Sequence, residues 1–277
     1  AIFGRSMPNW SVPYFACVTI GIVAVPILPD FTTEQVCKLI EHSQAKAVFV
    51  SERLASLISD DILEKMNLVV CIDNLKIICR NVTKESLETA VMERMPKPDD
   101  LAVIIYTAGT TSAPKGVMLS HKAITAQLPI YRKFFLIDEN YVFLSILPLS
   151  HVLEGSIGMI YPFSVGASVV YLDRLPTAAA LMTAFQKVRP TAMITVPLVI
   201  EKIYRGKILG TFSKNKCLKY LYEHIPLFRK AFHRIAGKKL MEVFGGRMKF
   251  IGIGGARLNT QAERFLKEGG IPYAIGY

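Results

Sequence analysis

The sequence predicts an α/β fold in which parallel-rich sheets are flanked by helices in a layered arrangement. Short apolar segments of strand length alternate along the whole chain with segments whose apolar residues recur at helical spacing. Such alternation is typical of parallel sheets joined by right-handed helical crossovers. Residues 101–106 carry no polar side chain except a terminal tyrosine, which is typical of a strand buried on both faces of a parallel sheet.

The first half of the chain predicts several elements in order. Residues 10–20 are apolar and form a predicted buried helix that ends at Gly21. Thr32 and Gln35 fit a capping box, so a second helix is expected to begin there. The strands of this half are expected at 47–50, 68–72 and 101–106.

In the second half the alternation continues. Helical spacing over 124–135 is interrupted by Pro129, which predicts a kink or an early break. Residues 216–244 form a predicted basic helical segment with a break at Pro226. Another helix is expected to be capped from Thr260, with Ala262, Phe265 and Leu266 facing inward. Strands are expected at 141–146, 168–172, 192–195, 249–253 and 271–275, enough for one large sheet or two adjoining ones.

Composition limits the class of protein. The chain has 277 residues, 51% hydrophobic and 20% charged, as in a globular protein that is long for one core and short for two full domains. Its net charge of +11 suits nucleotides, acidic cofactors, nucleic acid or a membrane surface, or is a solvated basic exterior. The cations concentrate between 202 and 249, among aromatic residues. RNA binding therefore stays open, although no recognised RNA motif occurs.

Cysteine usage and hydropathy bear on the compartment. Five scattered cysteines without a C-x-x-C pair favour a reducing compartment over a disulfide scaffold or a zinc site. The uncharged stretches 12–28 and 155–172 are interrupted by proline and glycine, so each better fits a buried helix and strand than a membrane span. We expect a cytoplasmic protein, with peripheral contact to the inner face of a membrane as a further option. The chain begins inside an apparent strand, which suggests a piece of a longer protein.

A loop rich in glycine and hydroxyl side chains follows the apolar strand at 101–106. Residues 106–116 read Tyr-Thr-Ala-Gly-Thr-Thr-Ser-Ala-Pro-Lys-Gly, which supplies backbone N–H groups, hydroxyls and an ammonium group to an anion. The expected ligand is a polyphosphate. The loop is not a Walker A motif, because Pro114 and Gly116 stand where that motif needs glycine and serine or threonine. A surface turn rich in threonine and serine is the alternative.

Several motifs together resemble one enzyme family. The motifs are residues 106–121, 147–154, 254–256 with 275–277, 3–10 and 21–26. Taken together along the chain, they are similar to the motifs of the adenylate-forming (AMP-binding) superfamily, and 147–154 resembles the motif of long-chain fatty-acid–CoA ligases, the acyl-CoA synthetases. The resemblance implies an incomplete adenylate-forming N-terminal domain over 1–277, truncated at both ends and without its C-terminal lid domain.

The resemblance also implies a set of site residues. The implied nucleotide-binding residues are Thr107, Gly109, Thr110, Thr111, Lys115, Gly254, Gly255, Ala256 and Tyr277. Among them, the loop residues hold the β- and γ-phosphates, the Gly-Gly-Ala backbone accommodates adenine, and the tyrosine ring stacks on it. Lys115 and His151 are the implied catalytic residues. The implied acyl pocket consists of His151, Val152, Gly155 and Gly158, for which ordinary core packing is the alternative reading.

The implied reaction is ATP-dependent activation of a fatty acid through an acyl-adenylate, followed by transfer to coenzyme A. ATP, Mg²⁺ and coenzyme A are the implied cofactors and co-substrates. No metal ligand is expected within the chain, because the family's magnesium glutamate follows the position of Tyr277. The fragment alone is therefore expected to be inactive. Ala108 and Ser112 depart from the family's usual serine and glycine, which puts the strength of the phosphate loop in doubt.

Three alternatives stay open. One is another carboxylate-adenylating enzyme of the same superfamily. The second is a nicotinamide-dependent oxidoreductase, although Ala256 and Arg257 break the required G-x-G-x-x-G pattern. The third is a non-catalytic basic module that binds RNA or an anionic membrane. If the protein is an adenylate-forming enzyme, we expect a fatty acid, ATP and coenzyme A as its partners and no nucleic acid. The oligomeric state stays open.

Overall fold

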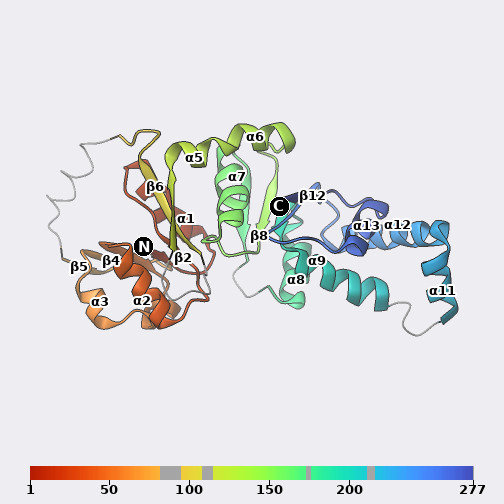
Figure 1. Cartoon of the computed structure of the whole chain (residues 1–277), viewed down its shortest axis with the longest axis horizontal. Helices are drawn as coiled ribbons and strands as arrows, with labels where there is room; N and C mark the ends of the chain where they lie inside the picture. The colour runs from red at the N-terminus through yellow and green to blue at the C-terminus, as the bar shows by residue number, and fades with distance from the viewer. Residues whose placement is uncertain (82–94, 108–114, 173–175, 211–215, 277) are drawn as a thin grey trace. The chain divides into compact units, whose positions relative to one another are not determined.

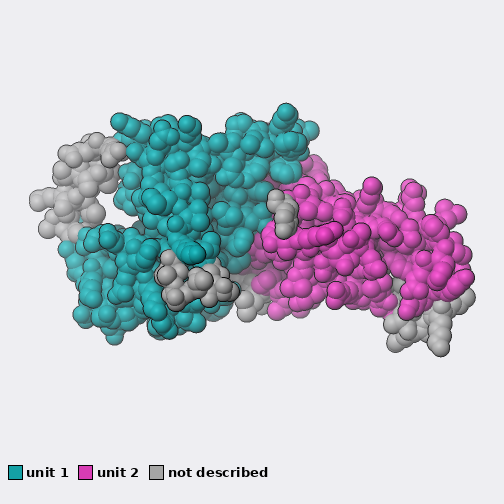
Figure 2. Space-filling model, viewed as in Figure 1, with its two compact units in different colours: residues 1–136, 148–164 teal, residues 137–147, 165–277 magenta. Residues whose placement is uncertain are grey.

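The computed structural model describes residues 1–81, 95–107, 115–172, 176–210 and 216–276, and its contacts divide the chain into two compact units. Unit 1 comprises residues 1–136 and 148–164, and unit 2 comprises residues 137–147 and 165–277; Figure 2 colours them separately. Each unit has a five-stranded sheet with helices, so the expected α/β class is confirmed. The sequence left one large sheet or two sheets open, and the structure has a separate five-stranded sheet in each unit.

Unit 1 contains a five-stranded sheet and a separate two-stranded hairpin (Figure 1). The sheet has the order β2-β1-β3-β4-β5, and its strands are parallel except for the antiparallel pair β4–β5. The strands are β1 (Ile2–Phe3), β2 (Pro26–Ile27), β3 (Ala47–Val50), β4 (Leu68–Cys71), β5 (Ile77–Arg80), β6 (Leu101–Thr107) and β7 (Lys115–Ser120). The helices are α1 (Pro8–Thr19), α2 (Thr33–His42), η1 (Glu52–Leu57), α3 (Asp60–Glu64), α5 (His121–Thr125), α6 (Gln127–Phe134), η2 (Glu154–Ile160) and α7 (Tyr161–Ser164).

The environment of β6 differs from the sequence expectation. Instead of lying inside a parallel sheet, β6 pairs antiparallel with β7, and its one parallel contact in the described residues is a single bridge between Ala24 and Val103. The cause is the apolar segment that follows the loop, because Val117, Met118 and Leu119 return alongside β6 as a second strand. Ile104 on β6 is only partly buried, so the expectation of burial on both faces is also wrong.

The capping box of α2 is confirmed. The Thr32 side chain accepts a hydrogen bond from the Gln35 backbone N–H at 3.4 Å, and the Gln35 side chain accepts one from the Thr32 N–H at 2.9 Å. These bonds satisfy two donors that the first turn of a helix would otherwise leave unpaired. The helix then buries Val36, Leu39 and Ile40 in the core of unit 1.

Removing this cap is expected to lower the free energy of unfolding by about 1 kcal/mol, the usual cost of replacing an N-cap threonine with alanine. The measurement is denaturant unfolding of the Thr32→Ala variant. Thr183→Ala is the control, because Thr183 lies inside a helix and its hydroxyl donates to the Ala179 carbonyl of the preceding turn. Equal losses in the two variants would show that the cap contributes nothing specific.

Unit 2 contains a five-stranded sheet in which every pairing is parallel, in the order β12-β11-β10-β8-β9 (Figure 1). Its strands are β8 (Val142–Ser145), β9 (Ser168–Tyr171), β10 (Ala192–Thr195), β11 (Phe250–Gly254) and β12 (Tyr273–Gly276). Its helices are α8 (Ala178–Val188), α9 (Pro197–Ile203), η3 (Tyr204–Leu209), α11 (Lys216–His224), α12 (Pro226–Val243) and α13 (Thr260–Glu268). In both units the second strand lies outside the first and the later strands extend on the other side, the order found in flavodoxin-like sheets.

Two helix boundaries lie near the predicted prolines, and the N-cap of a third helix differs from the prediction. The predicted break at Pro226 separates α11 from α12, where proline opens the new helix at a position that needs no N–H. The break near Pro129 falls at Ala126, so that Pro129 lies in the first turn of α6. The cap of α13 was assigned wrongly to Thr260. Its N-cap is Asn259, whose side-chain oxygen accepts from the N–H groups of Gln261 and Ala262 and so takes over the role predicted for threonine.

A buried chain of polar groups joins the helices of unit 2. Tyr204 and Tyr222 share a hydrogen bond of 3.0 Å, Tyr222 contacts Nε2 of His233 at 2.7 Å, and Nδ1 of His233 contacts Glu268 at 2.7 Å. Burial lowers the pKa of His233, and the hydrogen bond to Glu268 only partly opposes this effect. The histidine is therefore neutral near pH 7, with its Nδ1–H donating to Glu268 and its Nε2 accepting from Tyr222.

Acidification is expected to destabilise unit 2 through His233. An unfolded histidine takes up a proton near pH 6.5, whereas the folded His233 resists protonation, so the unfolding free energy should fall as the pH drops below about 6.5. Unfolding curves between pH 7.5 and 5 measure this slope. The slope should be reduced in His233→Gln and kept in His224→Gln, where the side chain is exposed. Identical slopes in both variants would contradict the assignment.

Two uncharged stretches of the sequence, 12–28 and 155–172, raise the question of a membrane span. Within the described residues, no helix combines the length and the apolar character needed to cross a bilayer. The apolar stretch at 155–172 forms η2, α7 and β9, as the prediction of a buried helix followed by a strand requires.

Candidate nucleotide and acyl site

The β6–β7 hairpin positions the two ends of the predicted phosphate loop. Thr107 at the end of β6 lies opposite Lys115 at the start of β7, so the structure brings these two predicted residues together. Lys115 is exposed at this end of the hairpin. Gly109, Thr110 and Thr111 lie outside the described residues, as do Ala108 and Ser112. A hydroxyl and an ammonium group therefore flank the segment that was predicted to bind phosphate.

Close packing explains the glycine that follows Lys115. A Cβ atom on Gly116 would lie 2.7 Å from a methyl carbon of Ile104 and 3.2 Å from the ring of Tyr106. Tyr106 itself is buried and its hydroxyl contacts Nδ1 of His42 at 2.8 Å, while burial raises the pKa of this tyrosine. The last residues of β6 are thus held from both sides, by α2 through His42 and by β7 through Gly116.

His151, Val152 and Gly155, three of the four residues predicted for the acyl pocket, line one small groove in unit 1. The groove is mostly apolar and its volume is about 40 Å³. The other residues that line it are Tyr14, Pro26, Val103, Ile105, Leu119, Ile124, Gln127, Leu149, Ser150, Ser156 and Ile160. The sequence reading missed these residues, although the apolar alternation of β6 and β7 could have indicated Val103, Ile105 and Leu119. Ligand pockets usually enclose about 300–1,000 Å³, so a long acyl chain requires side chains of this groove to move.

His151 is oriented by the backbone around it. Its Nδ1 accepts a hydrogen bond from the Leu153 N–H at 3.2 Å, while its own carbonyl accepts from the Gly155 N–H at 2.9 Å. In a neutral imidazole an accepting Nδ1 leaves the proton on Nε2. Because the side chain is exposed, this Nε2–H is available to donate to an anionic oxygen at the groove.

Gly158 has different surroundings from the other pocket residues. It lies inside η2, a π-helix that runs over Glu154–Ile160, and it is not among the residues that line the groove. A Cβ atom at this position would lie 2.7 Å from the carboxyl group of the fully buried Glu154. The glycine therefore makes room for a buried carboxyl group, and its contact with an acyl chain stays a prediction.

The predicted adenine motif lies at the carboxyl edge of the unit 2 sheet. Gly254 ends β11 and pairs with Gly276 of β12, next to Tyr277, which lies outside the described residues. Gly255 follows with φ +84°, a backbone conformation that favours glycine, and Ala256 is exposed. Gly254 is buried at the strand end, whereas Gly255 and Ala256 are exposed beyond it, and adenine binding by these three residues stays a prediction.

Two buried hydroxyls at the same edge were missed by the sequence reading. Ser145 ends β8 and Thr195 ends β10, and within the described residues neither side-chain oxygen has a hydrogen-bond partner. These neighbouring strands form the point at which the strand order of the sheet reverses, where open α/β sheets bind their ligands. A polar residue that ends each of two apolar strands is a signal that the sequence contained.

The described part of the chain contains no cluster of metal-ligating side chains. There, no three His, Cys, Asp or Glu side chains are arranged to hold an ion.

Two open α/β sheets of the same strand order, one of them with glycines at its carboxyl edge, define a protein of the open α/β sheet class. Comparison with known families makes this specific. The model of the family described as AMP-binding enzyme matches residues 1–277, and the chain belongs to this family.

Curated relatives of the chain include long-chain acyl-CoA synthetases. The chain is 30% identical over 309 residues to long chain acyl-CoA synthetase 2 of Arabidopsis thaliana, a match that covers 96% of the chain and 45% of the relative. It is 25% identical over 303 residues to long-chain-fatty-acid–CoA ligase 5 of Mus musculus, covering 96% of the chain and 43% of the relative. The chain thus spans less than half the length of these relatives.

Solved structures confirm the fold. The anthranilate CoA ligase AuaEII in complex with anthranoyl-AMP matches with a TM-score of 0.71 and 16% identity, over 100% of this chain and 48% of the other. The N-terminal domain of FACL13 from Mycobacterium tuberculosis matches with a TM-score of 0.69 and 17% identity, over 100% and 61%. The expected arrangement of an adenylate-forming enzyme is therefore shown at the level of the fold.

Proposed function

We propose that the protein of which this chain forms a part activates a fatty acid with ATP and transfers the acyl group to coenzyme A. The observation that carries the proposal is the similarity to long-chain acyl-CoA synthetases along 96% of the chain. Residues 1–277 correspond in this proposal to most of the large N-terminal domain. A separate lid domain completes the enzyme.

The proposed reaction has two steps. A carboxylate oxygen of the fatty acid attacks the α-phosphorus of ATP, which forms the acyl-adenylate and releases pyrophosphate. The thiol of coenzyme A then loses its proton and attacks the acyl carbonyl carbon, and AMP leaves. The carboxylate is already a nucleophile, so the protein contributes alignment and charge neutralisation.

The residues have distinct roles in this proposal. Lys115 and Thr107, at the two ends of the loop, contact the phosphates together with Gly109, Thr110 and Thr111. The Nε2–H of His151 donates to a carboxylate oxygen at the groove that Val152 and Gly155 border. The backbone of Gly254–Ala256 accommodates adenine, and Tyr277 stacks on it. Magnesium, when bound, adds charge neutralisation at the phosphates.

A short carboxylic acid is the second candidate substrate. The groove beside His151 encloses about 40 Å³, so a short acid requires less movement of the groove side chains than a long chain does. Both candidates share the adenylation step and differ only in the length of the acyl group.

Acyl-CoA formation by the full-length protein tests the proposal. We expect kcat/KM for the acid, with ATP and coenzyme A present, to rise with chain length, because each buried methylene contributes about 0.8 kcal/mol of binding until the pocket is full. A series of acids from butyrate to palmitate, with mass detection of the acyl-CoA, supplies the measurement. Activity confined to the shortest acids would favour the second candidate, and absence of any acyl-CoA would contradict both.

A further inference from the structure

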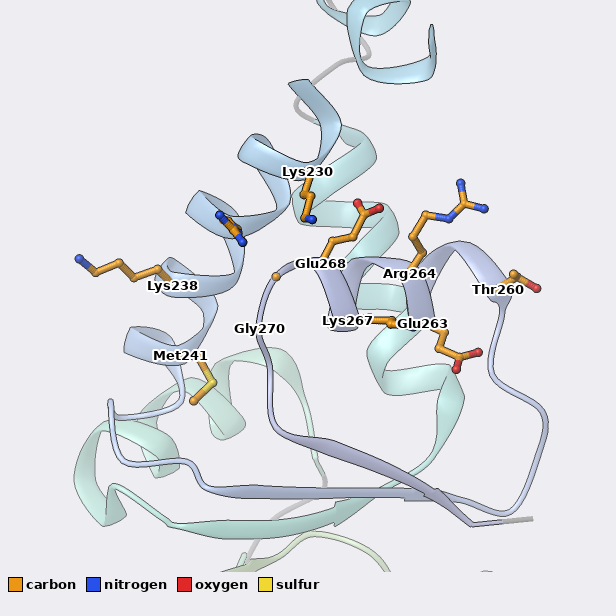
Figure 3. A pocket seen from close by; sticks show the side chains of 11 residues that line it. Lys230, Lys238, Met241, Thr260, Glu263, Arg264, Lys267, Glu268 and Gly270 are labelled. Carbon is orange, nitrogen blue, oxygen red and sulfur yellow. The ribbon is translucent and has the colours of Figure 1, made fainter. Parts of the chain in front are cut away.

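A large basic groove lies between α12 and α13 in unit 2, and the proposed reaction does not use it (Figure 3). Its volume is about 960 Å³. Five cationic side chains line it: Lys230, Arg234 and Lys238 from α12, and Arg264 and Lys267 from α13. We call these five residues the basic groove.

The helix geometry explains why these cations gather on one surface. Lys230, Arg234 and Lys238 are spaced four residues apart, so they share one face of α12, and all three are exposed. Arg264 and Lys267 are three residues apart on α13 and are exposed as well. In Figure 3 the labelled cations extend from two neighbouring helices, so the surface is not formed by one helix alone.

The positive charge of the basic groove is largely uncompensated. No ion pair involves any of the five cations within the described part of the chain. Two carboxylates also line the groove, Glu263 and Glu268. Glu268 is bound by two nitrogens of Arg229, at 3.2 and 3.3 Å, and by His233, so its charge is already neutralised from inside the unit.

Exposed apolar side chains accompany the cations on α12. Leu227 is 80% exposed and Ile235 is 60% exposed. Leu227 precedes Lys230 by three residues and Arg234 by seven, which places all three on one stripe of the helix. The solvent-facing side of α12 thus carries cations, which can contact anionic headgroups, and exposed apolar side chains, which can enter the headgroup boundary.

We propose that the basic groove and the exposed face of α12, with Leu227 and Ile235, form a docking surface for a membrane that contains anionic phospholipids. The five cations contact headgroup phosphates, and the two apolar side chains enter the boundary between headgroups and acyl chains. RNA is the less favoured partner, because no aromatic side chain on which bases could stack is present among the residues that line the groove. This docking does not depend on the proposed adenylation.

Vesicle co-sedimentation of the full-length protein tests the charge component. Binding is measured to phosphatidylcholine vesicles with and without phosphatidylglycerol at physiological salt. We expect binding only with the anionic lipid, weakening as salt rises. Equal binding to both kinds of vesicle, or to neither, would overturn the proposal.

Charge-neutralised variants locate the surface. The triple variant Lys230→Gln, Arg234→Gln and Lys238→Gln should bind anionic vesicles about 100-fold more weakly, since each basic residue near the surface contributes about fivefold. The matched control, Lys46→Gln, Arg53→Gln and Lys187→Gln, removes the same charge from exposed positions elsewhere. A control that loses as much affinity as the groove variant would show that net charge alone is responsible and would overturn the proposal.

Replacing the two exposed apolar residues distinguishes binding of a lipid membrane from binding of RNA or of soluble phosphates. Leu227→Ser with Ile235→Ser should weaken vesicle binding about tenfold, because both side chains lose their burial in the interface. The same variant should leave unchanged any binding of a mixed-sequence RNA or of inositol hexakisphosphate. Melting temperatures confirm that each variant is folded. Unchanged vesicle binding in the folded Leu227/Ile235 variant, or tighter binding of RNA than of anionic vesicles, would overturn the membrane assignment.

Discussion

Replacing Lys115 with alanine in the full-length protein should weaken ATP binding by about 1.5–3 kcal/mol, the contribution of a hydrogen bond to a charged group. Lys115 is exposed at the start of β7, directly opposite Thr107, so its ammonium group can reach a phosphate held by the loop between them. AMP has no β- or γ-phosphate, so its affinity should change little. Equilibrium binding of ATP and of AMP to the variant measures the difference.

A surface lysine on the same unit supplies the control. Lys133→Ala removes an exposed cation from α6 and should leave both affinities unchanged. If Lys115→Ala weakens ATP and AMP equally, the lysine does not contact the β- and γ-phosphates and the assignment of the loop has to be revised.

Replacing Gly158 with leucine should cost about 3 kcal/mol of unfolding free energy, at the upper end of the range for overpacking a core. The new side chain would enter the space of the Glu154 carboxyl group, which lies 2.7 Å from the position of a Cβ atom. Because Glu154 is fully buried, it cannot move without disturbing η2. Thermal unfolding of the full-length variant measures the loss.

Substrate profiles decide whether Gly158 also borders the acyl chain. A variant that is destabilised and loses activity equally at every chain length supports the packing role. Gly155→Ala is the comparison, because Gly155 lines the groove and its added methyl would lie 3.0 Å from the Leu149 carbonyl. A Gly158→Leu protein with an unchanged melting temperature and a selective loss of long acids would instead place Gly158 on the acyl path.

Much of the fold follows from local patterns in the sequence. The strand at β3, the capping box of Thr32 and the helix break at Pro226 each depend on a few neighbouring residues, and all three are confirmed. Local chemistry of this kind acts through backbone donors and fixed dihedral angles, so it can be recognised without tertiary information.

The predictions that were wrong depend on partners distant in the sequence or on competition between neighbours. An apolar strand such as β6 reads the same whether its neighbour is parallel or antiparallel, and only its pairing with β7 decides. At the start of α13 both Asn259 and Thr260 can cap a helix, and the structure selects the asparagine. The shared strand order of the two sheets leaves no repeat in the sequence, because many sequences satisfy one topology.

The residues of the candidate site also fall into two groups, those that the sequence indicates and those that only the structure indicates. Loop composition around Lys115 and the glycines at 254 and 255 were visible as motifs because their chemistry depends on residue type. The hydroxyls of Ser145 and Thr195 became candidates only when the sheet order placed their strands at the point where that order reverses. A strand end gains its functional meaning from its neighbours in the sheet, which single residues do not reveal.

Exchange of radiolabelled pyrophosphate into ATP by the full-length protein tests the central claim most directly. If the protein forms an acyl-adenylate, a fatty acid should support exchange without coenzyme A. The first step needs only the acid and ATP, and its reversal incorporates labelled pyrophosphate into ATP. Lys115→Ala should slow this exchange by about 10- to 100-fold. The contrary result is a folded protein that binds ATP but shows no exchange with any carboxylic acid tested. That result would contradict the proposal that the protein adenylates a carboxylic acid.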